Sequence, residues 1–386
     1  MSISLSKGLD NDTTASSKIS NKNGSMEFTP TIWSSYFKIK DDIQIGSDTF
    51  RIYRLGYEGA LLFCIHGGGF SALTWAAFCK NITSDVKCQC MAVDVRGHGD
   101  TNCDDESNLS IEQLTSDMID VILSLFPTEA PPIILIGHSM GGAVAINVAA
   151  SKKIPSLAGV CVIDVVEGSA LQTLKGMETF LKSRPNSFKS IQDGIFWSFR
   201  SSQIRNIESA RVSFPGQIKS VKNNETATKI LENTIKNYDN LKLQTTTTTE
   251  GNNNEEPIDP MKSRTLSIPS DLGDFTWRID LLKTSQFWSG WFTGMSNKFL
   301  KITEPKLIIL AGVDRLDREL MIGHMQGKFQ LEILTKAGHT IQEDDPKKVS
   351  DIISQFLIRH QFAAAKSHID NVTSNINILL SINTDQ

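Results

Sequence analysis

The chain has 386 residues, a formal net charge of −4 and 40% hydrophobic residues. A charge this close to neutral leaves no basic surface of the kind that binds nucleic acid, while the hydrophobic content can supply the core of one large α/β domain. No stretch approaches the twenty apolar residues of a membrane span, and the polar N-terminus lacks the apolar core of a signal peptide. We therefore expect a cytoplasmic protein, with the nucleus as a second compartment, whose partners include neither membrane nor nucleic acid.

The first informative element is an apolar strand at residues 61–65, which ends in the sequence HGGGF at 66–70. When a nucleophile attacks an acyl carbon, negative charge develops on the carbonyl oxygen, and backbone N–H groups fixed in a loop can stabilise that charge. The loop therefore predicts one donor of an oxyanion hole, which we place at Gly68. A glycine-rich turn without a ligand is the alternative.

A second strand, near residues 91–95, runs into the sequence DVRGHGDT at 94–101. We interpret this turn as structural, with Asp94 and Arg96 tying it together. His98 is predicted to be a hydrogen-bonded loop residue and not a catalytic base.

The strand at 133–136 leads into the motif G-x-S-x-G, formed by Gly137, Ser139 and Gly141, and then into a helix that begins with small residues. Glycines two positions before and after the serine let the backbone turn tightly enough to push the hydroxyl out of the sheet. This context predicts a nucleophile elbow, with Ser139 as the nucleophile and the N–H of Met140 as the second oxyanion donor.

The segment from about 168 to 300 is longer than a simple crossover requires and is predicted to form a helical cap. Helices are expected near 171–182, 189–200 and 203–213 and between 277 and 299. Residues 222–272 include a run of Thr, Asn and Glu and are predicted to be a low-complexity inserted loop, while 1–27 and 366–386 are expected to be disordered or flexible ends of a domain at 28–365. The aromatic residues of the cap either pack in its core or line a groove for the substrate: Trp197, Phe199, Trp288, Trp291 and Phe292. Its basic residues either lie on solvated helix faces or help to dock a partner protein: Arg200, Arg205 and Arg211.

His339 follows a predicted strand at 329–334 and lies in a glycine turn, and it is the candidate general base. The acid that would orient it has two candidates, because Asp164 ends the strand at 157–163 and Asp314 follows the strand at 306–311. The order serine, acid, histidine is that of α/β-hydrolases, and the residues alone leave both aspartates open.

The six cysteines are expected to be reduced thiols, and Cys88 and Cys90 lack a second pair of ligands at the spacing of a zinc site. No cofactor and no metal are predicted.

The chain resembles the protein phosphatase methylesterase family of serine hydrolases. The matching stretches are HGGGFSALTWA (66–76), LIGHSMGGA (135–143), CVIDVVEG (161–168), QIRNIESARVS (203–213), TWRIDL (276–281), GWFTGMS (290–296), LAGVDRLD (310–317), MQGKFQ (325–330), GHTIQED (338–344) and FLIRH (356–360).

The resemblance implies an α/β-hydrolase fold, with a mostly parallel central sheet, helices on both faces and a helical cap. It implies a serine carboxylesterase that demethylates the C-terminal leucine of the phosphatase 2A catalytic subunit, its partner, through an acyl-enzyme. By position it places the triad on Ser139, Asp164 and His339, so that Asp164 is preferred to Asp314. A small-molecule esterase or peptidase of the same fold, and a catalytically idle phosphatase-binding module, are the alternatives.

Overall fold

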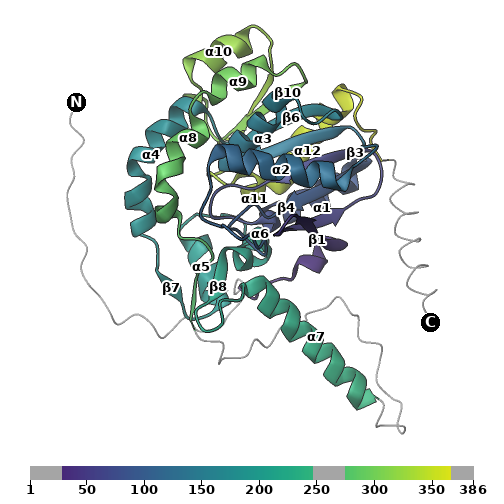
Figure 1. Cartoon of the computed structure of the whole chain (residues 1–386), viewed down its shortest axis with the longest axis vertical. Helices are drawn as coiled ribbons and strands as arrows, with labels where there is room; N and C mark the ends of the chain where they lie inside the picture. The colour runs from purple at the N-terminus through teal and green to yellow at the C-terminus, as the bar shows by residue number, and fades with distance from the viewer. Residues whose placement is uncertain (1–27, 247–273, 367–386) are drawn as a thin grey trace.

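The computed structural model describes residues 28–246 and 274–366, so the predicted ends at 1–27 and 366–386 lie outside the described part, apart from residue 366. An eight-stranded sheet in the order β1-β2-β4-β3-β5-β6-β10-β11 forms its centre (Figure 1). β2 runs antiparallel to its neighbours β1 and β4, and the other adjacent pairs are parallel, which confirms the predicted fold class. The strands are β1 (Ile39–Ile45), β2 (Asp48–Leu55), β3 (Ala60–Ile65), β4 (Cys88–Val93), β5 (Ile133–His138), β6 (Leu157–Ile163), β10 (Lys306–Leu310) and β11 (Gln330–Ile333).

Helices cover both faces of the sheet because the central strands are apolar on both sides. Along β5, Ile133 and Leu135 belong to the core on one face, while Ile134 and Ile136 belong to the core on the other. This is the near-continuous hydrophobic pattern typical of buried parallel strands. One core includes residues of α2 and α3 and the other includes residues of α1 and α12: α1 (Ala76–Asp85), α2 (Ile111–Leu125), α3 (Met140–Ser151) and α12 (Pro346–Arg359).

The cap lies between β6 and β10 in the chain and contains a second, three-stranded sheet in the order β7-β9-β8 that the sequence analysis missed. Figure 1 shows α4, α5 and α8 along one side of the main sheet. The elements of the cap are α4 (Glu167–Lys182), β7 (Ser187–Phe188), α5 (Ile191–Arg200), α6 (Ile207–Ser213), β8 (Ile218–Ser220), α7 (Ala227–Thr246), β9 (Phe275–Trp277), α8 (Ser285–Phe292) and α9 (Met295–Lys301). The remaining elements are η1 (Trp33–Ser35), η2 (Ala72–Trp75), η3 (Phe214–Gln217), η4 (Leu281–Thr284), η5 (Val313–Arg315), α10 (Arg318–Met325) and α11 (Ile341–Asp344).

Two of the predicted cap helices are shorter or broken for local reasons. α6 begins only at residue 207, because the side chain of Asn206 accepts hydrogen bonds from the N–H groups of Glu208 and Ser209 and so caps the helix there. The segment predicted as helical from 277 to 299 begins as strand β9, and Gly294, with φ +76°, separates α8 from α9.

The loop predicted at 222–272 is wrong in its first half, because residues 227–246 form helix α7. The start of that helix packs into the core of the cap through Ile230 and Leu231, both nearly inaccessible to solvent. Glu232 accepts hydrogen bonds from Trp33 Nε1 at 2.7 Å and from Lys40 Nζ at 2.5 Å. The Thr-rich run that suggested a loop begins only near residue 245, and residues 247–273 lie outside the described part.

Deleting residues 224–268 and joining the ends by a short Gly/Ser linker is therefore expected to lower the melting temperature by about 5 °C or more. The deletion removes two buried aliphatic side chains and the carboxylate that binds Lys40. Scanning calorimetry measures the change, and Leu231→Ala alone should reproduce part of it. An unchanged melting temperature would show that α7 contributes little to stability.

All six cysteines are buried free thiols, as the sequence predicts. Burial raises the pKa of the Cys161 thiol, for example, which keeps it protonated and unreactive. None of the helices in the described ranges is long and apolar enough to cross a bilayer.

Candidate active site

Ser139 lies in a strained turn between β5 and α3, with φ +52° and ψ −121°. A Cβ atom on Gly137 would lie 2.2 Å from the carbonyl oxygen of Gly141, and one on Gly141 would lie 2.3 Å from that of Ile65. Only glycine fits at either position, which is why the motif surrounds the serine with them. The turn therefore exposes the half-buried Ser139 at the end of β5, where the sequence predicts a nucleophile.

Asp164 and His339 meet beside this serine. The Nδ1 atom of His339 lies 2.8 Å from Oδ2 of Asp164, and the N–H of Ala311 donates to Oδ1 at 3.0 Å. Burial opposes ionisation of Asp164, but the hydrogen bond and charge of His339, the hydrogen bond from the N–H of Ala311 and the charge of Arg315 hold its pKa below the usual value. An ionised Asp164 fixes the proton of His339 on Nδ1 and leaves Nε2 free to accept one.

Asp314, the alternative acid, does not reach the histidine. It is exposed in η5, and no hydrogen bond or ion pair involves it among the contacts of residues 28–246 and 274–366. Its neighbour Arg315 instead forms an ion pair with Oδ2 of Asp164, a contact that the sequence analysis missed. Of the two aspartates, only Asp164 contacts His339.

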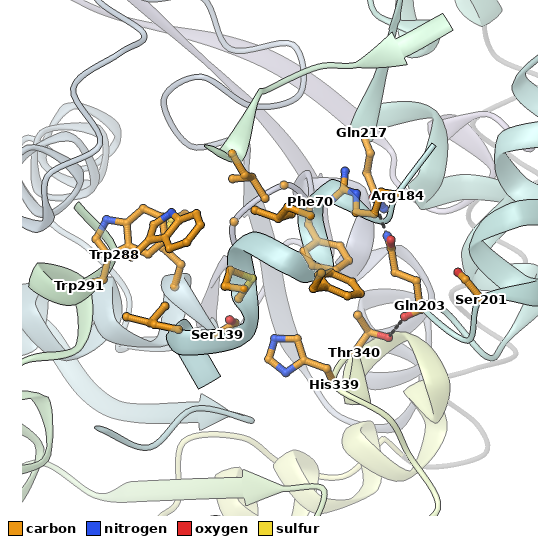
Figure 2. Close-up of a pocket in the computed structure, with 18 of the residues that line it drawn as sticks. Phe70, Ser139, Arg184, Ser201, Gln203, Gln217, Trp288, Trp291, His339 and Thr340 are labelled. Atoms are coloured by element: carbon orange, nitrogen blue, oxygen red, sulfur yellow. Dashed lines mark hydrogen bonds between the residues drawn. The ribbon is translucent and has the colours of Figure 1, made fainter. Parts of the chain in front are cut away.

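Ser139 and His339 both face the same cavity, and Figure 2 shows the imidazole beside the serine. Within the described ranges, no hydrogen bond joins the serine hydroxyl to the ring. Catalytic hydrogen bonds of this kind are often long or misaligned before substrate binds and tighten in the complex.

The glycine loop after β3 lines the same cavity as the serine through Gly68. The N–H of Gly69 donates to Nε2 of His98 at 2.9 Å, and the N–H of Phe70 donates to the carbonyl of Gly67 at 3.2 Å. Gly68 lines the cavity together with Ser139 and Met140, whereas Gly67 does not. Gly68 is therefore the residue of this loop that can offer a free N–H beside the serine.

His98 supports the loop and is not placed as a base, as the sequence predicts. Because its Nε2 accepts from Gly69, its Nδ1 carries the proton and donates to the carbonyl of Arg96 at 2.8 Å. Burial lowers the pKa of His98 to about 4 and keeps the ring neutral. Asp94 accepts a hydrogen bond from the N–H of Asp100 within the turn, and Arg96 bonds to Asp117 and Asp48, so the two residues hold the turn together as predicted.

The cavity has a volume of about 310 Å³ and is largely apolar. Figure 2 shows Trp288 and Trp291 on one side of Ser139 and a group of polar side chains on the other. Phe70 projects between the tryptophans and this polar group. Trp288 and Trp291 are also part of the main core, so the two predicted roles of these aromatic residues coexist. Phe199 does not line the cavity, whereas Trp197 and Phe292 do.

The loop that carries His339 is anchored to the cap. Arg205 binds residues on both sides of the histidine in the chain. Its guanidinium donates to the carbonyl of Lys336 at 2.9 Å, and its backbone N–H donates to the carboxylate of Asp344 at 2.7 Å. Its side chain is exposed, as one of the two predicted roles requires, and docking to a partner stays a prediction. The fully buried Glu343 accepts from Ser213 Oγ at 2.5 Å and from Thr74.

The buried carboxyl group of Glu343 is expected to make the stability of the folded protein depend on pH. Burial, reinforced by the charge of Asp344 and opposed by the two hydroxyl hydrogen bonds, raises its pKa to about 8. Because the folded pKa lies above the unfolded value of about 4.3, the stabilisation is complete below that value and is lost as the pH rises toward 8. The melting temperature of the wild type relative to Glu343→Gln is therefore expected to fall by about 5 °C between pH 5 and pH 8. Thermal melts of both proteins at each pH measure this, and a constant difference would contradict it.

Curated relatives resemble the chain over most of its length. Protein phosphatase methylesterase 1 of Mus musculus is 45% identical over 344 residues, which cover 87% of this chain and 86% of the relative. The protein of the same name from Schizosaccharomyces pombe is 36% identical, with 85% of each chain covered. The chain belongs to the protein phosphatase methylesterase family. It is thus a hydrolase of the esterase class.

The family's fold agrees with the sheet and helices described above. The chain matches the alpha/beta hydrolase family over residues 62–352. An esterase of M. tuberculosis superposes with a TM-score of 0.56 at 19% identity, covering 83% of this chain and 92% of that one. E-2-(acetamidomethylene)succinate hydrolase superposes with a TM-score of 0.57 at 17% identity, covering 83% and 99%. At these identities the two structures support the fold alone.

Proposed function

We propose that this methylesterase-family chain removes the methyl ester from the C-terminal leucine of the phosphatase 2A catalytic subunit, using Ser139, His339 and Asp164 as its triad. The contact between His339 Nδ1 and Asp164 Oδ2, behind a serine in a nucleophile elbow, is the observation that carries the proposal. The named relatives support the choice of a phosphatase as the protein substrate.

In the first half of the reaction, Ser139 Oγ attacks the ester carbonyl carbon while Nε2 of His339 takes its proton. The N–H groups of Gly68 and Met140 stabilise the negative charge on the carbonyl oxygen. Collapse of the tetrahedral intermediate breaks the bond to the methoxy oxygen, which leaves as methanol with the proton from His339. The leucine carbonyl is then esterified to Ser139.

In the second half, water attacks the acyl-enzyme and His339 accepts one of its protons. The C–O bond to Ser139 breaks, the serine takes the proton from His339, and the leucine carboxyl group is released and gives its proton to solvent. Asp164 holds the imidazole in the correct tautomer and stabilises the imidazolium in both halves. The reaction consumes one water and needs no cofactor.

The apolar walls of the cavity suit this substrate. The indole rings of Trp288 and Trp291 lie on one side of Ser139 and can cover the side chain of a leucine. Burial of an aliphatic side chain of this size contributes about 1.5–3 kcal/mol to binding. This end of the cavity would select for an apolar acyl residue.

Incubating the purified chain with methylated phosphatase 2A catalytic subunit tests the proposal. We expect mass spectrometry to show loss of one methyl group from the C-terminal peptide, with release of methanol. The kcat/KM for the methylated phosphatase subunit should exceed the kcat/KM for p-nitrophenyl acetate. Turnover of small esters with no loss of the protein methyl ester would favour the small-molecule esterase instead.

A further inference from the structure

The cavity that contains Ser139 has a second, polar end. Figure 2 shows Arg184, Gln203 and Gln217 grouped on the far side of Phe70 from Trp288 and Trp291. All line the same cavity as the serine. Arg184 is the only lysine or arginine among its lining residues in the described ranges, and those ranges place no aspartate or glutamate on the wall. This end of the cavity is therefore electropositive.

Arg184 is held in place without a counter-ion. Its guanidinium carbon lies 3.4 Å from the centre of the Trp277 ring, so the guanidinium stacks on the indole. The Nε1 atom of Trp277 donates to the carbonyl of Pro185 at 2.7 Å, which fixes the indole. Among residues 28–246 and 274–366, no carboxylate pairs with Arg184. Stacking occupies the face of the guanidinium and leaves the N–H groups along its edge available.

Trp277 belongs to an aromatic cluster that orients this assembly. Its ring centre lies 5.3 Å from that of Phe188 and 5.4 Å from that of Trp197. Burial lowers the pKa of Arg184 to about 10, so the group is charged at neutral pH while it lacks part of its hydration. A cation in this condition gains more from an anionic partner than a fully hydrated one does.

Gln217 supplies a second unused donor. The side chain of Gln203 donates to its Oε1 at 2.9 Å, which leaves Nε2 of Gln217 pointing elsewhere. That nitrogen is buried and has no hydrogen-bond acceptor among the described residues. A buried donor left without an acceptor costs about 1–3 kcal/mol, which a ligand's acceptor can recover.

We propose that Arg184 and Gln217 form a subsite for a carboxylate side chain of the substrate peptide, upstream of the esterified leucine. The inference rests on the function proposed above, in which the terminal residue lies at Ser139. The guanidinium N–H groups of Arg184 and those of Gln217 Nε2 have no hydrogen-bond acceptor within the described residues. Because Arg184 is also positively charged, the complementary group is an acceptor that carries negative charge. A carboxylate can accept two parallel hydrogen bonds from the edge of a guanidinium. The subsite would thus select acidic tails.

Synthetic peptides that end in leucine methyl ester test the subsite. A single glutamate is moved through the four positions upstream of the leucine in an otherwise neutral sequence, and each peptide is paired with one that has glutamine at that position. The Vmax/KM of each is divided by the concentration of active sites, counted by fluorophosphonate titration, to give kcat/KM. The wild type should prefer glutamate at one position by about tenfold, through a lower KM.

Arg184→Gln is expected to reduce that preference to less than twofold, and Arg184→Lys to keep part of it because the charge remains. Arg200→Gln is the matched control, since Arg200 also lies over an aromatic ring of the cap, that of Phe196, but is exposed and outside the cavity. It should retain the full preference. Should Arg184→Gln fail to label with the fluorophosphonate, Gln217→Leu is used and should reduce the preference about threefold.

Equal kcat/KM for glutamate and glutamine peptides at all four positions would overturn the subsite. A preference that survives Arg184→Gln in a protein that labels normally would overturn it as well. In both cases the peptides are still demethylated, so the proposed function stands. Failure of the wild type to hydrolyse every peptide methyl ester would instead contradict the proposed function itself.

Discussion

Replacing Ser139 with alanine is expected to lower ester hydrolysis by about 10⁵-fold or more while leaving the fold intact. The variant loses the atom that attacks the ester, and neither His339 nor Asp164 can substitute for it. The substitution removes one hydroxyl from a half-buried position, so the melting temperature should change little. Hydrolysis of p-nitrophenyl acetate, fluorophosphonate labelling and a thermal melt measure the three effects.

Ser202→Ala is the matched control for this experiment. Ser202 also lines the cavity and also has a positive φ, +59° compared with +52° for Ser139. It should retain full activity and label normally. Wild-type turnover by the Ser139 variant would eliminate the proposed triad.

Replacing Asp164 with asparagine is expected to lower turnover by about 10⁴-fold. The amide can donate to Nδ1 of His339 and so favours the wrong tautomer, and it cannot stabilise the imidazolium that forms when the serine loses its proton. It also leaves Arg315 without its carboxylate partner. Kinetics on an activated ester, with circular dichroism to confirm folding, give the result.

Asp314→Asn is the comparison for Asp164→Asn, because it makes the same change at the other strand end. Asp314 is exposed and forms no hydrogen bond or ion pair with His339 or Arg315 in the described structure, so the turnover of the variant should stay within about twofold of wild type. A crippled Asp314 variant beside a nearly normal Asp164 variant would reverse the assignment of the acid.

Local sequence was sufficient to predict the elbow and the glycine loop. The glycines around Ser139 are required by contacts within about ten residues or with one neighbouring strand, so the motif and its conformation are inseparable. Local sequence was not sufficient to choose between Asp164 and Asp314. Both follow strands that lie side by side, and only the three-dimensional path of η5, which brings Arg315 to Asp164 and leaves Asp314 exposed, separates them.

The cap was the least predictable part, because its structure depends on contacts that span long distances in the chain. The three strands of its small sheet have at most three residues each and pair across 55 to 89 positions, so none carries a periodic signal of its own. α7 was missed because a low-complexity run directly follows it. The stacking of Arg184 on Trp277 likewise joins residues far apart in the chain, which left no sequence pattern for the polar end of the cavity.

The most direct test of the account is loss of the methyl group from methylated phosphatase 2A catalytic subunit, followed by mass spectrometry of its C-terminal peptide with wild type, Ser139→Ala and Ser202→Ala in parallel. The account predicts rapid and complete loss with the wild type and with Ser202→Ala, and none above the no-enzyme rate with Ser139→Ala. Equal rates of demethylation by the Ser139 variant and the wild type would contradict it.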